Sequence, residues 1–354
     1  MHEQLGARLL QGEVAAAARA CRIVDERWPG HLELLEALYP HTLGAWLIGV
    51  TGSPGVGKST LVSRLIEHFR AGGSRVGVVA VDPSSPFSGG AILGDRIRMQ
   101  SHFADAEVFI RSVATRGAVG GLSRTTADMA RVLMAWGAHV VLIETIGVGQ
   151  DELDVMRVAH TTLVVQAPGA GDDVQAAKAG LMECADVFVV NKADLPGAEE
   201  AASQLRGMLA IAEATRHPVP LGQGHSGALA WPAPREFKEP AALGGSWQVP
   251  VLTAVAARAH GIAELVGELE RHKGWLDGTE QGALRRRARL RQELAALIRD
   301  AVTDAILDQH ADEIESAVER ITERETDPYA ASRNLVSRFA GVSPSLPVSS
   351  LPSA

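Results

Sequence analysis

The chain has 354 residues, of which 46% are apolar and 21% are charged, so it is long enough to bury a large hydrophobic core. Its formal net charge of −8 gives no electrostatic reason to expect nucleic acid or an anionic membrane surface as a partner. No apolar stretch reaches the roughly 20 residues of a membrane-spanning helix, and no signal peptide is evident, so we expect a cytoplasmic protein.

Residues 1–42 predict an N-terminal helical arm. Apolar residues recur at helical spacing over residues 5–38, and Pro29-Gly30 divides this segment into two short helices. The arm contains Cys21, and the only other cysteine, Cys184, lies far away in the sequence. Because the chain has no Cys-x-x-Cys or Cys/His spacing, we expect neither a disulfide framework nor a structural zinc site.

Residues 43–277 predict an α/β domain. Short β-branched runs alternate there with amphipathic helical segments, a pattern typical of βαβ units and a mostly parallel, doubly wound sheet. Continuous apolar character suits strands that are covered on both faces. The expected strands are residues 46–50, 76–81, 108–110, 139–143, 162–166, 187–190 and 249–252.

A glycine-rich loop follows the first expected strand and precedes a helical pattern. Glycines allow a tight turn and bring backbone N–H groups close to phosphate oxygens, because they lack a Cβ. We expect Lys58 to reach the β- and γ-phosphates of a nucleotide and the Ser59 hydroxyl to ligate Mg²⁺. The predicted phosphate-binding residues are Gly52, Ser53, Pro54, Gly55, Val56, Gly57, Lys58, Ser59 and Thr60. The expected fold is therefore a three-layer P-loop NTPase with N-terminal and C-terminal helical extensions.

Two later strands are each followed or ended by an acid, Asp82 and Glu144. Both should lie at the carboxyl edge of the sheet beside the phosphate loop, where acids hold Mg²⁺ directly or through water. Asp82, which precedes a proline, could instead cap a helix. Glu144 begins an acid-x-x-Gly segment, in which the Gly147 N–H can bond the γ-phosphate and the segment relaxes when that phosphate leaves. With Asp95 as a third acid near the metal or the attacking water, the catalytic candidates are Lys58, Asp82, Asp95 and Glu144, and the metal candidates are Ser59, Asp82, Asp95 and Glu144.

The segment Asn191-Lys192-Ala193-Asp194 follows a late strand and predicts recognition of guanine. The Asp194 carboxylate can accept from both N1–H and the 2-amino group of guanine, whereas adenine offers no matching pair of donors. Asn191 is expected to hold the neighbouring loops and contact the base, and the stem of Lys192 to lie over the base. The residues after the last strand that could give a backbone N–H to the guanine carbonyl are Thr253, Ala254 and Val255.

The remainder of the chain is less informative. Residues 222–247 are expected to form an irregular insertion, and residues 343–354 a disordered tail. Residues 278–342 predict a C-terminal helical arm for dimerisation, with one long helical pattern to about Arg324 and then one more helix. Its arginines at 285, 286, 287, 289 and 291 are followed closely by acids and lack nearby aromatics, which favours a solvated helix face or a subunit contact.

Three longer strings resemble the methylmalonyl-CoA mutase-associated GTPases, also called the ArgK/MeaB family. They are VDPSSPFSGGAILGDR at residues 81–96, ETIGVGQ at residues 144–150 and PGAGDDVQAAKAG at residues 168–180. The likeness extends from the N-terminal helices to Asp327-Pro328-Tyr329. The insertion at residues 222–247 is longer than is usual in this family.

The resemblance implies a homodimeric chaperone that uses GTP, GDP and Mg²⁺ to gate cobalamin delivery to an adenosylcobalamin-dependent acyl-CoA mutase and to protect or reactivate that enzyme. It also implies that Asp82, Asp95 and Glu144 organise metal and water, that Gln150 follows the second switch, and that residues 168–178 form a further switch facing the mutase. Which acyl-CoA the mutase uses stays open.

Two other functions remain as alternatives. A P-loop kinase would use ATP, which Asp194 argues against. A nickel- or zinc-delivery GTPase would need soft ligands, usually a Cys/His cluster near the switch, and the sequence shows no such cluster there. The sequence has no evident arginine finger beyond the candidates Arg96 and Arg98. We therefore predict slow intrinsic GTP hydrolysis that a partner accelerates.

Overall fold

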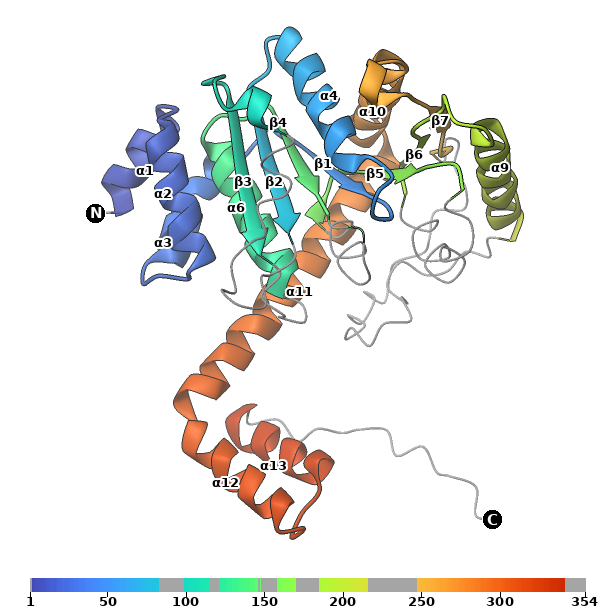
Figure 1. Cartoon of the computed structure of the whole chain (residues 1–354). Coiled ribbons are helices and arrows are strands. Elements are labelled where there is room, and N and C mark those ends of the chain that lie inside the picture. The colour runs from blue at the N-terminus through green and yellow to red at the C-terminus, as the bar shows by residue number, and fades with distance from the viewer. Residues whose placement is uncertain are drawn as a thin grey trace, which may run out of the picture. The chain divides into compact units, whose positions relative to one another are not determined.

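The computed structural model describes residues 2–82, 99–114, 121–145, 147, 158–169, 185–215 and 247–340. The chain divides into two compact units, residues 1–289 and residues 290–354. The first unit contains a β-sheet with helices on both of its faces (Figure 1). Within the described part of the chain, no helix is both long enough and apolar enough to cross a membrane.

The sheet of the first unit has seven strands in the order β3-β2-β4-β1-β5-β6-β7, and every pairing is parallel. The predicted α/β fold with a parallel sheet is thus confirmed. Because the strands are parallel, their carboxyl ends share one edge, and the loop after β1 lies near the ends of β4 and β5. The strands are β1 (Trp46–Thr51), β2 (Val76–Asp82), β3 (Val108–Ala114), β4 (Val140–Glu144), β5 (Thr161–Gln166), β6 (Val187–Val190) and β7 (Val251–Thr253).

β6 has the predicted bounds, β1, β2, β4 and β5 differ from them by one residue at one or both ends, and β3 and β7 differ by more. β3 continues to Ala114 although its expected end was residue 110, because Arg111 and Ser112 interrupt the apolar run that predicted it. The Arg111 guanidinium lies 3.6 Å from the Asp25 carboxylate, so the strand tolerates this charge where it meets the N-terminal helices. β7 is shorter than expected and begins at Val251 rather than at residue 249.

Apolar side chains on both faces of the strands explain the layers. In β1, Leu47 packs in one core with α6 (Gly121–Ala135), while Ile48 and Val50 pack in another with α4 (Lys58–Ala71) and α10 (Ile262–Gly278). A third cluster joins β5 and β6 to α9 (Ala198–Thr215). Residues that alternate in a strand point to opposite faces, so a strand covered on both faces must be apolar throughout.

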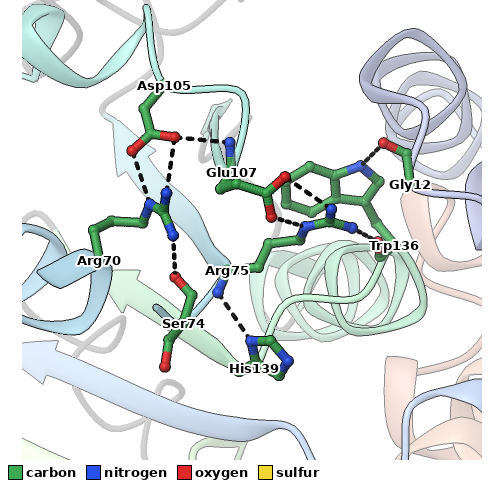
Figure 2. Close-up of polar contacts among 8 residues, drawn as sticks. All are labelled: Gly12, Arg70, Ser74, Arg75, Asp105, Glu107, Trp136 and His139. Carbon is green, nitrogen blue, oxygen red and sulfur yellow. Dashed lines mark hydrogen bonds and ion pairs between the residues drawn. The ribbon is translucent and has the colours of Figure 1, made fainter. Parts of the chain in front are cut away.

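The N-terminal arm has three helices rather than the predicted two: α1 (His2–Leu10), α2 (Val14–Asp25) and α3 (His31–Leu38). The additional break lies at Gly12, whose φ of +82° is in the left-handed region that glycine adopts readily. The Trp136 indole donates to the Gly12 carbonyl over 2.9 Å (Figure 2). This bond fixes the turn between α1 and α2 beside the end of α6.

Paired charges close the amino edge of the sheet between β2 and β3 (Figure 2). Arg75 donates to both carboxylate oxygens of Glu107 over 2.7 and 3.0 Å and to the Trp136 carbonyl over 2.9 Å. Arg70, near the end of α4, donates to both oxygens of Asp105 over 2.8 and 3.2 Å. These two-pronged contacts fix the starts of β2 and β3 to the ends of α4 and α6.

The second unit is helical, and α11 (Glu280–Gln309) begins in the first unit and ends in the second. The single long pattern predicted up to about Arg324 breaks at His310, and α12 (Ala311–Thr322) follows. α13 (Pro328–Ala340) begins after Asp327, whose carboxylate accepts the N–H groups of Tyr329 and Ala330 over 2.9 Å each. Asp327 therefore caps the last helix.

Candidate functional site

The glycine-rich loop connects β1 to α4 and is held by two neighbouring segments. Gly52 has a φ of +138°, and a Cβ at this position would lie 2.0 Å from the Val165 carbonyl oxygen in β5. Gly57 has a φ of +95°, and a Cβ there would lie 2.4 Å from Nδ2 of Asn191. Only glycine fits these two positions, so the loop is shaped by its contacts with β5 and the end of β6.

Lys58 and Ser59 begin α4, and both are buried. The Lys58 ammonium donates to the carbonyls of Gly52 over 2.7 Å and Ser53 over 3.1 Å, which keeps it over the loop. The Ser59 hydroxyl donates to Glu144 Oε1 over 2.6 Å. A hydroxyl and a carboxylate held together at a helix N-terminus are hard oxygen ligands, so this pair suits Mg²⁺ next to phosphate.

The acid-x-x-Gly segment lies against the glycine-rich loop. Gly147 has a φ of +91°, and a Cβ there would lie 2.1 Å from the Gly52 carbonyl oxygen and 2.5 Å from the Lys58 ammonium. The Thr145 N–H donates to the Val50 carbonyl over 3.1 Å and thereby fixes the end of β4 to β1. The structure thus brings together residues that are 95 positions apart in the sequence, such as Val50 and Thr145.

Of the other predicted residues on the phosphate side, one ends β2 and most lie outside the described part of the chain. The backbone of Asp82 ends β2 and pairs with Ala114, at the same edge of the sheet as Glu144. Asp95, Gln150 and most of the expected switch at residues 168–178 lie outside the described residues. The expected insertion at residues 222–247 is likewise outside them, except for Trp247.

Asn191 bridges the glycine-rich loop and the segment after β7. Its Nδ2 donates to the Val56 carbonyl over 2.9 Å, and its Oδ1 accepts the Ala256 N–H over 3.0 Å. Lys192, with a φ of +56°, donates from Nζ to the Gly55 carbonyl over 2.7 Å. The prediction that Asn191 holds neighbouring loops is confirmed by these contacts.

Asp194 lies at the open end of this arrangement. Its Oδ2 is 3.6 Å from a terminal nitrogen of Arg258, and the two side chains are 34% and 74% exposed. Arg258 ends a short 3₁₀ turn, η3 (Ala256–Arg258), that follows β7. A carboxylate this accessible can accept hydrogen bonds from a ligand, with a cationic side chain beside it.

The amides predicted to contact the guanine carbonyl already have acceptors within the chain. The Ala254 N–H donates to the Val190 carbonyl over 2.9 Å, and the Val255 N–H donates to the His260 carbonyl over 3.0 Å. Thr253 is paired with Val190 as the last residue of β7. The segment nearest to the Asn191 amide is therefore the η3 turn, one residue further along the chain.

Sequence reasoning missed two residues that shape this side of the site, Arg64 and Arg258. Arg64 lies on α4 and donates to the carbonyls of Ala256 over 3.0 Å and Ala257 over 3.3 Å. These contacts join residues 192 and 193 positions apart, and no local pattern in the sequence signals them. Arg258 carries only the weak signal of a charge close behind the last strand.

Known proteins resemble this chain in sequence and in fold. A family model described as "Methylmalonyl Co-A mutase-associated GTPase MeaB" matches residues 17–311, which include every site residue named above. A protein of Pyrococcus abyssi is 41% identical over 298 residues, or 84% of each chain, and GTPase ArgK of Escherichia coli is 43% identical over 191 residues, or 53% of this chain and 58% of its own. The crystal structure of a LAO/AO transport system kinase matches 96% of this chain and 98% of its own, with a TM-score of 0.62 and 26% identity.

Proposed function

This chain belongs to the MeaB family of methylmalonyl-CoA mutase-associated GTPases, and we propose that it acts as a GTP-driven chaperone of an adenosylcobalamin-dependent acyl-CoA mutase in the cytoplasm. The observation that carries this proposal is the close approach of Gly147 to Gly52 and Lys58, which leaves no room for a Cβ. A segment that touches the phosphate loop can change its position when the γ-phosphate is bound or lost. The site is therefore suited to switching as well as to hydrolysis.

On the phosphate side, Lys58 neutralises the β- and γ-phosphates, while loop amides from Gly52 to Thr60 surround them. Ser59 and Glu144 would hold Mg²⁺, and Asp82 and Asp95 are the further acids assigned to metal or water. The metal would supply positive charge against the phosphates. The short Ser59–Glu144 contact supports this assignment, because it already places two oxygen ligands side by side.

On the base side, the Asp194 carboxylate accepts from N1–H and the 2-amino group of guanine, and Asn191 orients the loop that surrounds the base. Lys192 covers the base with its aliphatic stem. The contacts of Asn191 with both Val56 and Ala256 support this assignment, since they join the phosphate loop to the base-reading segment. These contacts keep the base side of the proposed site at a fixed distance from the phosphate loop.

The partner assignment follows from the family description, which names association with methylmalonyl-CoA mutase. In the proposed cycle, GTP hydrolysis times the delivery of cobalamin and protects or reactivates the mutase. Intrinsic hydrolysis is slow and the mutase accelerates it, because the phosphate site gains catalytic charge only when a partner completes it. The protein works as a homodimer through its C-terminal helices.

Binding and turnover with purified mutases test this function. The chain is mixed with methylmalonyl-, isobutyryl-, ethylmalonyl- or hydroxyisobutyryl-CoA mutase in GDP and in a non-hydrolysable GTP analogue. We expect one mutase to bind with an affinity that depends on the nucleotide and to raise the GTP hydrolysis rate about tenfold or more.

Lys58→Ala is the matched variant for this experiment. It removes the phosphate-binding ammonium, so mutase binding should persist but no longer respond to nucleotide. If none of the mutases binds in either nucleotide state, the chaperone proposal fails while the GTPase assignment remains.

A further inference from the structure

Arg64 makes three contacts from the middle of α4. Its Nε and one terminal nitrogen form a fork that donates to the successive carbonyls of Ala256 and Ala257, over 3.0 and 3.3 Å. Its other terminal nitrogen donates to Glu67 over 2.7 Å. All three guanidinium nitrogens are thus engaged, and two of them hold the η3 turn rather than the helix to which Arg64 belongs.

The Ala256 residue is consequently fixed from two sides. Its N–H donates to the Asn191 side chain, and its carbonyl accepts from Arg64. Asn191 is itself anchored on the Val56 carbonyl in the glycine-rich loop. Beyond its own backbone hydrogen bonds, the η3 turn is therefore tied to the phosphate loop through Asn191 and to α4 through Arg64.

These contacts determine which backbone and side-chain groups of the η3 turn can face a nucleotide. No cis peptide bond occurs in the described part of the chain, and the carbonyl and N–H of a trans peptide point in opposite directions. With the Ala256 carbonyl directed at Arg64, the Ala257 N–H is directed away from α4. The same turn holds Arg258 at 3.6 Å from the Asp194 carboxylate.

We propose that Arg64 is a positioning residue for guanine recognition. It holds the η3 turn so that the Ala257 N–H and the Arg258 side chain face the base beside Asp194. Arg64 does not touch the nucleotide; it acts through the two carbonyls. A lysine cannot replace it fully, because a single ammonium lacks the planar fork that engages two carbonyls at once. This inference rests on the proposed nucleotide site and adds the element that keeps its base side in register with its phosphate side.

The test compares GDP and ADP affinities of the full chain by calorimetry for the wild type, Arg64→Ala, Arg64→Lys and Glu67→Gln. We expect Arg64→Ala to weaken GDP binding about tenfold while ADP affinity, which depends on the phosphates, changes less than about twofold. Arg64→Lys should recover part of the loss. Glu67→Gln, which removes only the ion pair of Arg64, should resemble the wild type. Equal weakening of GDP and ADP, or unchanged GDP binding in Arg64→Ala, would overturn the proposal.

Hydrogen exchange gives a second readout that does not depend on the nucleotide. Amides of residues 254–261 should exchange about tenfold faster in Arg64→Ala than in Glu67→Gln, because the turn has lost its fork. Unchanged exchange there contradicts the positioning role, and if Arg64→Ala does not fold, Arg64→Lys provides both measurements. A wild type that binds ADP as tightly as GDP would instead refute the nucleotide site itself, so the two failures are distinguishable.

Discussion

At the scale of residues, the proposed preference for guanine nucleotides rests on a single carboxylate, that of Asp194. Asp194→Asn replaces one acceptor oxygen with an amide that donates, so N1–H and the 2-amino group of guanine can no longer both be satisfied. We expect GDP affinity to fall roughly 100-fold, because a polar group of the bound base is left unpaired. Xanthosine diphosphate, which carries a carbonyl in place of the 2-amino group, should bind the variant better than GDP does.

Calorimetry with GDP and xanthosine diphosphate measures both effects. Glu199→Gln is the matched control, since Glu199 is an exposed acid of α9 that pairs with Arg206 and its change removes the same charge. GDP binding should be unaffected in that control. An Asp194→Asn protein that keeps the wild-type preference would contradict the base assignment.

Local motifs predicted the residues of the site that act through short-range geometry. Lys58 and Ser59 follow from a glycine-rich loop between a strand and a helix, and Asn191 follows from its place at the end of a late strand. Arg64 could not be predicted in this way, because its role depends on carbonyls of residues 256 and 257, which only the folded chain brings to α4. Backbone carbonyls leave no trace in the residue types of a sequence.

At the scale of elements, the arginine run at the start of α11 makes contacts within the chain that the sequence did not predict. Arg285 lies 2.7 Å from the Asp186 carboxylate at the start of β6, and Arg289 donates to the Ala159 carbonyl before β5 over 3.2 Å. Arg286 donates to the Leu276 carbonyl at the end of α10. These three arginines thus attach the start of α11 to neighbouring segments, a role that the sequence did not predict. The Arg285 and Arg286 side chains nevertheless remain 43% and 37% exposed, so the interpretation as a solvated face or a subunit contact stays a prediction.

A buried histidine belongs to the same cluster. The Trp46 indole donates to the Thr161 hydroxyl over 3.0 Å, so this hydroxyl can donate to His272 Nδ1 at 2.9 Å. His272 Nε2 lies 3.4 Å from Asp186 Oδ1. Burial lowers the pKa of His272 to about 4, although the Asp186 charge opposes this shift and the Arg285 charge adds to it.

The lowered pKa predicts a loss of stability in acid. Between pH 6.5 and pH 4 the unfolded chain binds a proton at this histidine and the folded chain does not, so the free energy of unfolding falls as the pH falls. From pH 7 to pH 5 this single group should contribute a decrease of about 2 kcal/mol. In His272→Gln the decrease over the same range should be smaller by about that amount, as measured by urea unfolding.

The control for this experiment is His41→Gln, which changes an exposed histidine near the N-terminal helices. Its pH dependence should match that of the wild type. If His272→Gln loses stability in acid as steeply as the wild type does, His272 is not the group responsible.

For the whole molecule, the order and type of most elements follow from the sequence because the sheet is covered on both faces. Strands such as β1 and β4 are buried along their whole length and have no polar side chain before their last residue, so their runs stand out between polar turns. The breaks at Gly12 and His310 were not predicted, because neither has a proline beside it and the apolar spacing continues across them. Packing against other helices decides where such breaks occur, and a local sequence pattern carries no information about that packing.

The assembly of two chains is the remaining prediction at this scale. In the second unit, α11 exposes Leu290, Leu294, Ile298 and Val302, with exposed fractions of 51%, 56%, 47% and 51%. Residues four apart lie on one side of a helix, so these four form an apolar stripe of the width that helices bury against a partner. We expect Leu294→Asp combined with Ile298→Asp to dissociate a homodimer, because two carboxylates would have to be buried in the interface.

Light scattering coupled to size exclusion measures the outcome directly. The mass should fall from that of two chains to that of one, 37.4 kDa. Gln292→Asp, which adds a charge at an exposed position of α11 about half a turn away from Leu294, should leave the wild-type mass unchanged. The proposal fails if the wild type has the mass of one chain or if the double variant keeps the mass of two chains. Either result would show that this stripe does not join the subunits, and the arm would then need another partner.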